Sequence, residues 1–175
     1  RYCAAMLESP SSFYKKTDLE SLMGAAIRYR IQPLDVNAHL FQVSMTVAKP
    51  ASAGQVLRLP AWIPGSYMIR EFSRHIVQIA ARSGKKTVAL QKLDKHSWQA
   101  AAVKGELTVE YTVYAYDLSV RGAYLDQQRG FYNGTSVFLS ADGYESEPCE
   151  VEIVAPEGKE FADWKVATSL PALET

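Results

Sequence analysis

Cysteine and histidine are both scarce in this chain of 175 residues. Its two cysteines, Cys3 and Cys149, lie near opposite ends and have no CxxC or Cys/His neighbour. Such a pair cannot build the framework of several disulfides that small secreted domains use, and it lacks the ligand spacing of a structural zinc site. We therefore expect two free thiols and no cofactor bound to this chain.

Charge of one sign is also missing, because 19 basic residues balance 19 acidic ones. Without a clustered basic field, nothing draws the chain to nucleic acid or to anionic lipid. No run reaches the roughly 18 apolar residues of a membrane span. The start, Arg1 to Leu7, is broken by Glu8 too soon for a signal peptide, although a signal removed earlier would leave the same start. We expect no nucleic-acid or membrane partner; the compartment stays open, with the cytoplasm favoured over a periplasmic or secreted location.

The sequence motifs of a hydrolase are absent as well. None of the three histidines, His39, His75 and His96, belongs to an H-E-x-x-H pair, which places two imidazoles on one side of a zinc ion. No G-x-S-x-G elbow surrounds Ser66 or Ser119, and no glycine-rich nucleotide loop occurs. Since a Ser-His-Asp triad is recognised by geometry, a hydrolase that uses Ser66 or Ser119 stays open as a third hypothesis. No residue is assigned a catalytic or metal-binding role.

Alternating apolar and polar residues fill most of the chain from residue 26 onward. The clearest runs are Ile27–Ile31, Phe41–Val47 and Leu107–Ala115. Shorter strands are predicted at 56–59, 75–81, 87–90, 98–102, 137–139, 151–154 and 164–167. No long segment has a helical apolar period. Short connections between short strands predict an all-β domain, an antiparallel β-sandwich or saddle-like fold with short helices or none.

The first 25 residues differ from this pattern. A Ser-Pro-Ser-Ser run at 9–12 indicates a loop, and residues 17–23 suit one or two helical turns. We therefore predict two parts: a leader of unknown role over residues 1–25, with at most one short helix, and a β-rich domain over residues 26–175.

Three polar-aromatic clusters interrupt the strands, and the first spans residues 59–72. Two prolines and a glycine stiffen it, and it carries Trp62, Tyr67 and Arg70. A rigid loop that presents aromatic side chains and an arginine is typical of a contact surface. The same aromatics would equally serve to close the end of a sandwich.

The second cluster spans residues 114–121 and the third residues 126–135. In the second, Asp117 and Arg121 are spaced to form a charge-assisted pair across a turn, or each could serve a partner. In the third, Asn133 begins an Asn-Gly pair between apolar runs. That pair predicts a tight hairpin turn in preference to a glycosylation acceptor.

These clusters carry a resemblance to a known family. The segments LPAWIPGSYMIREFSRHI, KLDKHSW, VYAYDLSVRGAYLD and GFYNGTSVFL follow one another in this order. They resemble the N-terminal domain of the glycyl aminopeptidase family, which are zinc metallopeptidases of the gluzincin type. The resemblance runs from about Ile27 to the C-terminus. It implies a full-length protein with a β-rich N-terminal domain, a thermolysin-like zinc domain and a C-terminal PDZ domain. The resemblance also implies that this full-length protein removes N-terminal glycine or alanine from peptides.

The resemblance implies a scaffold role for this chain. No position corresponds to a zinc ligand of the family, so zinc is implied for the full-length protein only. The domain is expected to pack on the catalytic domain of the same polypeptide and to wall one side of the cleft that binds the peptide substrate. The residues expected at this interface or cleft are Trp62, Tyr67, Arg70, Asp117, Arg121 and Asn133.

Two hypotheses of different classes therefore lead. The first is a non-catalytic domain of a zinc aminopeptidase, inactive alone, whose bare apolar patch around Trp62 and Tyr67 promotes self-association. The second is a stand-alone β-sandwich that binds peptide or carbohydrate, since exposed aromatics beside polar turns suit that task. An H-E-x-x-H motif downstream in the same reading frame supports the first and excludes the second.

Overall fold

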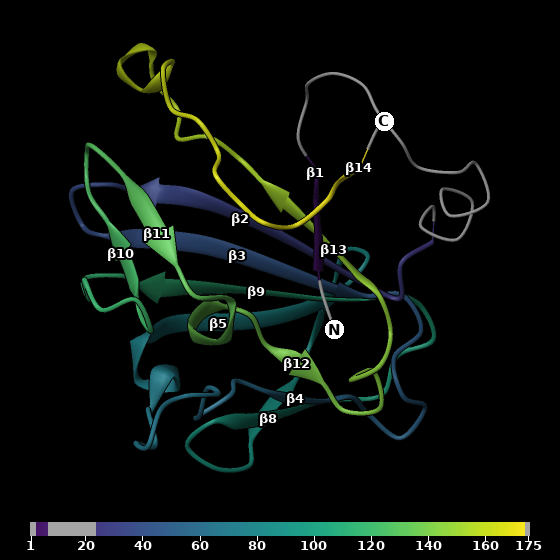
Figure 1. Cartoon of the computed structure of the whole chain (residues 1–175). Helices are drawn as coiled ribbons and strands as arrows, with labels where there is room; N and C mark the ends of the chain where they lie inside the picture. The colour runs from purple at the N-terminus through teal and green to yellow at the C-terminus, as the bar shows by residue number, and fades with distance from the viewer. Residues whose placement is uncertain (1–2, 7–23, 174–175) are drawn as a thin grey trace.

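The computed structural model describes residues 3–6 and 24–173 (Figure 1). The helix expected within residues 17–23 lies outside the described residues. The largest sheet has eight strands in the order β14-β1-β13-β2-β3-β9-β5-β6. Its strands are β1 (Cys3–Met6), β2 (Ile27–Asp35), β3 (Leu40–Val47), β5 (Ile76–Ser83), β6 (Lys86–Val88), β9 (Leu107–Tyr114), β13 (Cys149–Ile153) and β14 (Ala172–Leu173).

A second sheet of four strands has the order β12-β4-β8-β7, and β10 and β11 form a separate hairpin. These strands are β4 (Val56–Arg58), β7 (Leu90–Lys92), β8 (Ser97–Ala100), β10 (Ala123–Leu125), β11 (Gly130–Tyr132) and β12 (Ser140–Ala141). The short helices of the described part are η1 (Phe72–His75), α2 (Gly134–Val137) and η2 (Lys159–Phe161). None of its helices has the length and apolar character needed to cross a membrane.

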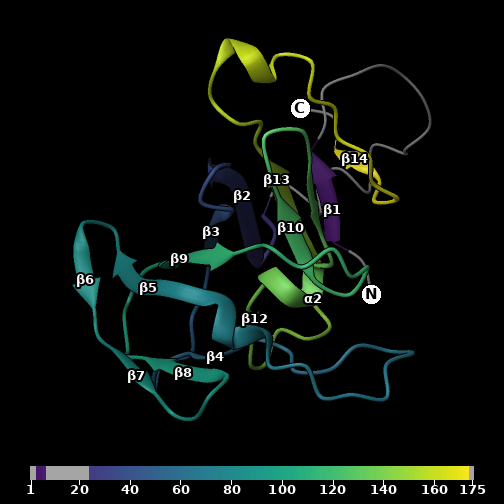
Figure 2. The ribbon, with the colours of Figure 1, turned by 90° about the vertical axis from the view of Figure 1, so that its left-hand side faces the viewer.

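The core lies between the two main sheets (Figure 2). In β3 the residues alternate in burial, because successive side chains of a strand point to opposite faces. Its buried members are Phe41, Val43, Met45 and Val47. Leu57 of β4 and Trp98 of β8 pack into the same cluster from the smaller sheet. The period-two pattern of the sequence thus became the inward face of a sandwich, and the predicted all-β class is confirmed.

One edge of the large sheet departs from the antiparallel expectation. The centre, from β2 through β3 and β9 to β5, is antiparallel. β13, however, pairs in parallel with both β1 and β2. In the chain, β3 to β12 lie between β2 and its parallel partner β13, and so long a crossover permits parallel pairing where a tight hairpin does not.

Two predicted strands are not formed. Around residues 137–139 the chain instead leaves the one-turn helix α2 and passes through the core, where Val137 and Leu139 are fully buried. Residues 164–167 follow η2 without joining a sheet. There the ring of Trp164 packs edge-to-face on Phe161, with 5.6 Å between ring centroids. At 137–139 irregular backbone buries the apolar residues, whereas at 164–167 Trp164 is half-buried and Val166 is exposed. Strand periodicity does not distinguish such segments from a short strand.

The expectation of two free thiols is wrong, because Cys149 is disulfide-bonded. The two cysteines are far apart in the sequence, and neither has a local neighbour that suggests pairing. The register of β1 against β13 nevertheless places the Cα of Cys3 opposite that of Cys149. Strand pairing, which the sequence pattern did not predict here, created this proximity.

Candidate functional site

Two long connections leave the sheets on the same side of the molecule (on the right in Figure 2). The first comprises residues 62–74, between β4 and β5, and the second residues 116–121, between β9 and β10. They meet at a small hollow that residues of η1 line together with Tyr116 and Asp117. We call residues 62–74 and 116–121 together the loop face. It contains five of the six residues that the sequence predicted for an interface.

Large apolar side chains stand exposed on the loop face. Those at least half exposed are Trp62, Tyr67, Met68, Ile69, Tyr116, Leu118 and Val120. Soluble monomers rarely expose so many large apolar residues side by side unless the patch serves contact with another molecule or domain. Phe72, the last residue of the first cluster, is buried in the core and helps to close the sandwich. Trp62 and Tyr67 are exposed, which favours the contact-surface interpretation for this part of the cluster.

The first connection is folded by its own hydrogen bonds. The Ser66 amide donates to the carbonyl of Ile63 at 3.2 Å, and Ile63 is buried in the core. Gly65 stands between them with φ at +79°, a value that favours glycine. The indole Nε1 of Trp62 donates to the Ser66 carbonyl at 2.6 Å, and Arg70 Nε donates to Ser66 Oγ at 3.2 Å. The loop is consequently shaped before any partner arrives.

The second connection uses its carboxylate internally. Asp117 Oδ1 accepts from the amide of Ser119 at 2.8 Å, and Ser119 Oγ accepts from the amide of Arg121 at 3.2 Å. A Cβ at Gly122 would stand 2.6 Å from Asp117 Oδ2, so this close approach requires glycine. The expected ion pair between Asp117 and Arg121 is not among the ion pairs of the described residues. The Asp117 carboxylate is instead hydrogen-bonded within its own turn.

Asn133 lies beside this connection but faces its own helix. Its amide donates to the carbonyl of Gly122 at 2.9 Å. Its side-chain Oδ1 accepts from the amide and the hydroxyl of Thr135, at 3.1 and 2.7 Å. Asn133 is thus the N-cap of α2, and the prediction of a hairpin turn at the Asn-Gly pair is wrong. A half-buried cap with its acceptor in use offers little to a partner.

The serine-hydrolase hypothesis fails on geometry. Ser66 and Ser119 use their hydroxyls within the loops, as described above, and among the described residues neither is hydrogen-bonded to a histidine. His75, on η1, instead accepts at Nε2 from Arg74 Nε at 3.1 Å. Partial burial, with the charge of Arg74 added, lowers the pKa of His75. Within the part of the chain that the structure describes, neither serine is therefore paired with a base.

A metal site is equally unsupported in the described part of the chain. Residues 3–6 and 24–173 contain no group of three His, Cys, Asp or Glu side chains placed to hold a metal ion. A hollow of about 630 Å³ lies away from the loop face, and Asp35, Glu157 and Glu160 are among the residues that line it. These residues do not fit a zinc centre.

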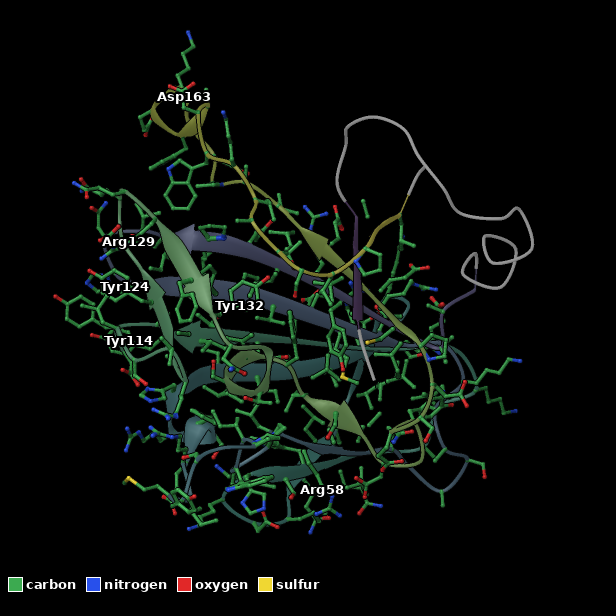
Figure 3. All side chains as sticks on the ribbon, viewed as in Figure 1. Arg58, Tyr114, Tyr124, Arg129, Tyr132 and Asp163 are labelled. Atoms are coloured by element: carbon green, nitrogen blue, oxygen red, sulfur yellow. The ribbon has the colours of Figure 1, made fainter. Side chains whose placement is uncertain are left out.

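One aromatic cluster escaped the sequence analysis. The ring of Tyr116 lies 4.2 Å from that of His39 and 5.5 Å from that of Tyr124, centroid to centroid. Arg129 lies over the Tyr124 ring at 5.6 Å, and both stand at the left edge of Figure 3. His39 has φ at +59°, uncommon for a residue other than glycine, and its Nδ1 donates to the Leu125 carbonyl at 2.6 Å. Only strand register brings these four residues together.

Comparison with known proteins finds a family and a solved structure to which this chain is similar. The sequence model of a family described as the Peptidase M61 N-terminal domain matches residues 28–175. Among solved structures, the chain is similar to an aminopeptidase N family protein from Idiomarina loihiensis, with 42% sequence identity and a TM-score of 0.75. The similarity covers 83% of this chain but 26% of that one. No curated protein gives a significant match. The chain belongs to the family of peptidase M61 N-terminal domains.

Proposed function

We propose that this chain is the non-catalytic N-terminal domain of a zinc-dependent aminopeptidase that prefers N-terminal glycine or alanine. Its membership in a family of peptidase N-terminal domains supports the association with peptide hydrolysis. The solved relative is a much longer chain, of which this one spans 26%, which leaves room for a catalytic domain and a PDZ domain. The zinc, which supplies an activated water for peptide hydrolysis, belongs in this proposal to the catalytic domain.

The loop face is the observation that carries the proposed role. Its exposed apolar side chains suit the surface of a neighbouring domain, which buries them and removes their contact with water. Hydrogen bonds such as that from Trp62 to Ser66 already hold the loop in shape. Docking therefore costs little ordering entropy. We propose that this face packs on the catalytic domain and that its rim walls one side of the peptide-binding cleft.

A stand-alone module that binds peptide or carbohydrate is the second candidate. The exposed rings of Tyr114 and Tyr116, beside Tyr124 and Arg129, favour it, because aromatic faces next to polar groups suit such ligands. Tyrosine fluorescence, titrated with peptides and oligosaccharides against a Tyr116→Ala control, tests it. A saturable change that the variant abolishes would support the module, and its absence would exclude it.

The experiment that tests the leading proposal compares this chain with its full-length polypeptide. Zinc content and the hydrolysis of glycyl- and alanyl-anilides are measured on both. We expect zinc and activity in the full-length protein and neither in the 175-residue chain. Cleavage of either anilide by the chain alone would overturn the proposal, and the search for a catalytic group would then return to His39, His75 and His96.

A further inference from the structure

Seven of the eight arginines in the described part of the chain fall into two sets. Those on the sheets each have a carboxylate within 2.9 Å; the pairs are Arg28–Glu106, Arg30–Glu152, Arg58–Asp142 (at the bottom of Figure 3) and Arg82–Glu110. The loop face holds three more, Arg70, Arg74 and Arg121. Among the residues that the structure describes, none of these three is in an ion pair. Arg129, on the β10–β11 hairpin, is also in none of these ion pairs and lies over the Tyr124 ring. Within the described residues, three of the four arginines without a carboxylate partner therefore lie on the loop face.

The guanidinium groups of this second set have hydrogen-bonding capacity to spare. Arg70 and Arg121 are half-buried. Within the described residues, the Arg70 guanidinium donates only to Ser66 Oγ, and the Arg121 guanidinium has no hydrogen-bond partner. A guanidinium carries five N–H donors in a planar fork that matches a carboxylate. Donors that are partly withdrawn from water without an acceptor cost free energy, which a carboxylate from outside would recover.

The carboxylates of the loop face itself do not fill this role. Glu71 is in an ion pair with Lys95, which belongs to the smaller sheet's β7–β8 connection. Asp117 accepts the Ser119 amide within its own turn. With Glu71 neutralised by Lys95, three arginines stand against the single charge of Asp117. The loop face therefore has an excess of positive charge, although the whole chain is balanced at 19 against 19.

We infer that the loop face docks on an acidic surface of the same polypeptide, beyond residue 175, which supplies carboxylates to Arg70, Arg74 and Arg121. This inference rests on the proposed function and names the chemistry of the partner. The solved relative extends far past the part that this chain covers, so the same polypeptide offers the surface. Exposed Trp62 and Tyr67 form an apolar centre beside the arginines. Trp, Tyr and Arg are the residues that dominate protein interfaces.

Zero-length cross-linking in the full-length polypeptide tests the inference. Arg70→Lys, Arg74→Lys and Arg121→Lys, made singly, keep the charge and introduce an amine that a carbodiimide couples to an adjacent carboxylate. We expect mass spectrometry to find at least two of the three joined to an Asp or Glu beyond residue 175. Arg82→Lys is the matched control, expected to join Glu110 within the domain. The native Lys95–Glu71 pair reports that the reagent worked.

Oxidative footprinting separates failure of this inference from failure of the proposed function. Tyr67 and Met68, exposed in this chain, should be protected in the full-length protein. Neutralising Arg70, Arg74 and Arg121 to Gln should raise their oxidation there at least about tenfold, because docking loses its charge pairs. The same change at Arg28, Arg30 and Arg82 should not. Protection without cross-links or charge effect would overturn the acidic partner alone, and unprotected Tyr67 and Met68 would overturn the docking as well.

Discussion

Two tyrosine hydroxyls inside the core hold the irregular segment that follows α2. Tyr111 donates to the Val137 carbonyl at 2.8 Å and accepts from the Leu139 amide at 3.1 Å. Tyr29 donates to the Leu139 carbonyl at 2.6 Å. Burial raises the pKa of both hydroxyls, so they remain protonated donors at neutral pH. Side chains thus satisfy backbone groups that a strand partner satisfies elsewhere.

We expect Tyr111→Phe to lower the free energy of unfolding by about 1–3 kcal/mol, since it leaves two buried backbone groups without their partner. Urea denaturation of the 175-residue chain measures it. Tyr67→Phe, at a fully exposed position, is the control and should change it by less than about 0.5 kcal/mol. Equal stability of the two variants would contradict the assigned role of Tyr111.

Tyr111→Phe should also change how the free energy of unfolding depends on pH in alkaline solution. Because the folded pKa of Tyr111 lies above the ordinary value of 10.0, the unfolded state loses its proton first as pH rises. The stability that the protonated Tyr111 hydroxyl contributes is therefore fully present below pH 10 and is lost as pH rises above it. Tyr111→Phe should reduce the alkaline loss of stability. Tyr67→Phe should leave that loss unchanged, which distinguishes a lost titration from general weakening.

Turns decide where the strands of this domain can meet. The connection from β3 to β4 passes through Gly54, whose φ is +105°. A Cβ at Gly54 would stand 2.6 Å from the carbonyl oxygen of Ala100, at the end of β8. Ala100 in turn donates its amide to the Gln55 carbonyl at 2.9 Å, which joins this turn to the smaller sheet. The smaller sheet therefore depends on a backbone approach that no other residue permits.

Gly54→Ala should destabilise the domain by about 1–3 kcal/mol, because it combines backbone strain with a clash against another backbone. Thermal unfolding followed by circular dichroism measures the loss. Gly105→Ala is the matched control: its nearest contact would be Ser83 Oγ at 3.6 Å, an ordinary van der Waals distance. Equal melting temperatures for the Gly54→Ala and Gly105→Ala variants would contradict this prediction, because the turn would then relax without cost.

At the scale of the whole molecule, the apolar loop face stands free. Tyr67, Met68 and Ile69 are consecutive and exposed, and their side chains take no part in the core. A patch of this kind promotes association of the isolated domain with itself.

Replacing Tyr67, Met68 and Ile69 together by Ser should reduce self-association of the 175-residue chain and leave its melting temperature unchanged, since little buried area is lost. Sedimentation velocity over a range of concentrations measures the change. Val77→Ser, at an exposed apolar position on β5, is the control and should associate as the wild type does. If the triple variant associates as the wild type does, the surface responsible for self-association lies outside Tyr67, Met68 and Ile69.

Local sequence patterns predicted the all-β class, the central strands and the clusters that form the loop face. Each of these depends on local patterns: the two-residue period of β3 and β9, and the Pro, Gly and aromatic content of residues 59–72. Such signals are legible because side-chain direction and turn chemistry are set within a few residues.

The contacts between residues far apart in the chain come from the tertiary structure. It set Cys149 opposite Cys3, ran β13 parallel to β2, and placed Tyr116 between His39 and Tyr124. In the tertiary structure the Asp117 carboxylate also accepts a hydrogen bond within its own turn and does not pair with Arg121. These outcomes depend on strand register and on competition among hydrogen-bond partners far apart in the chain, and no local pattern encodes either.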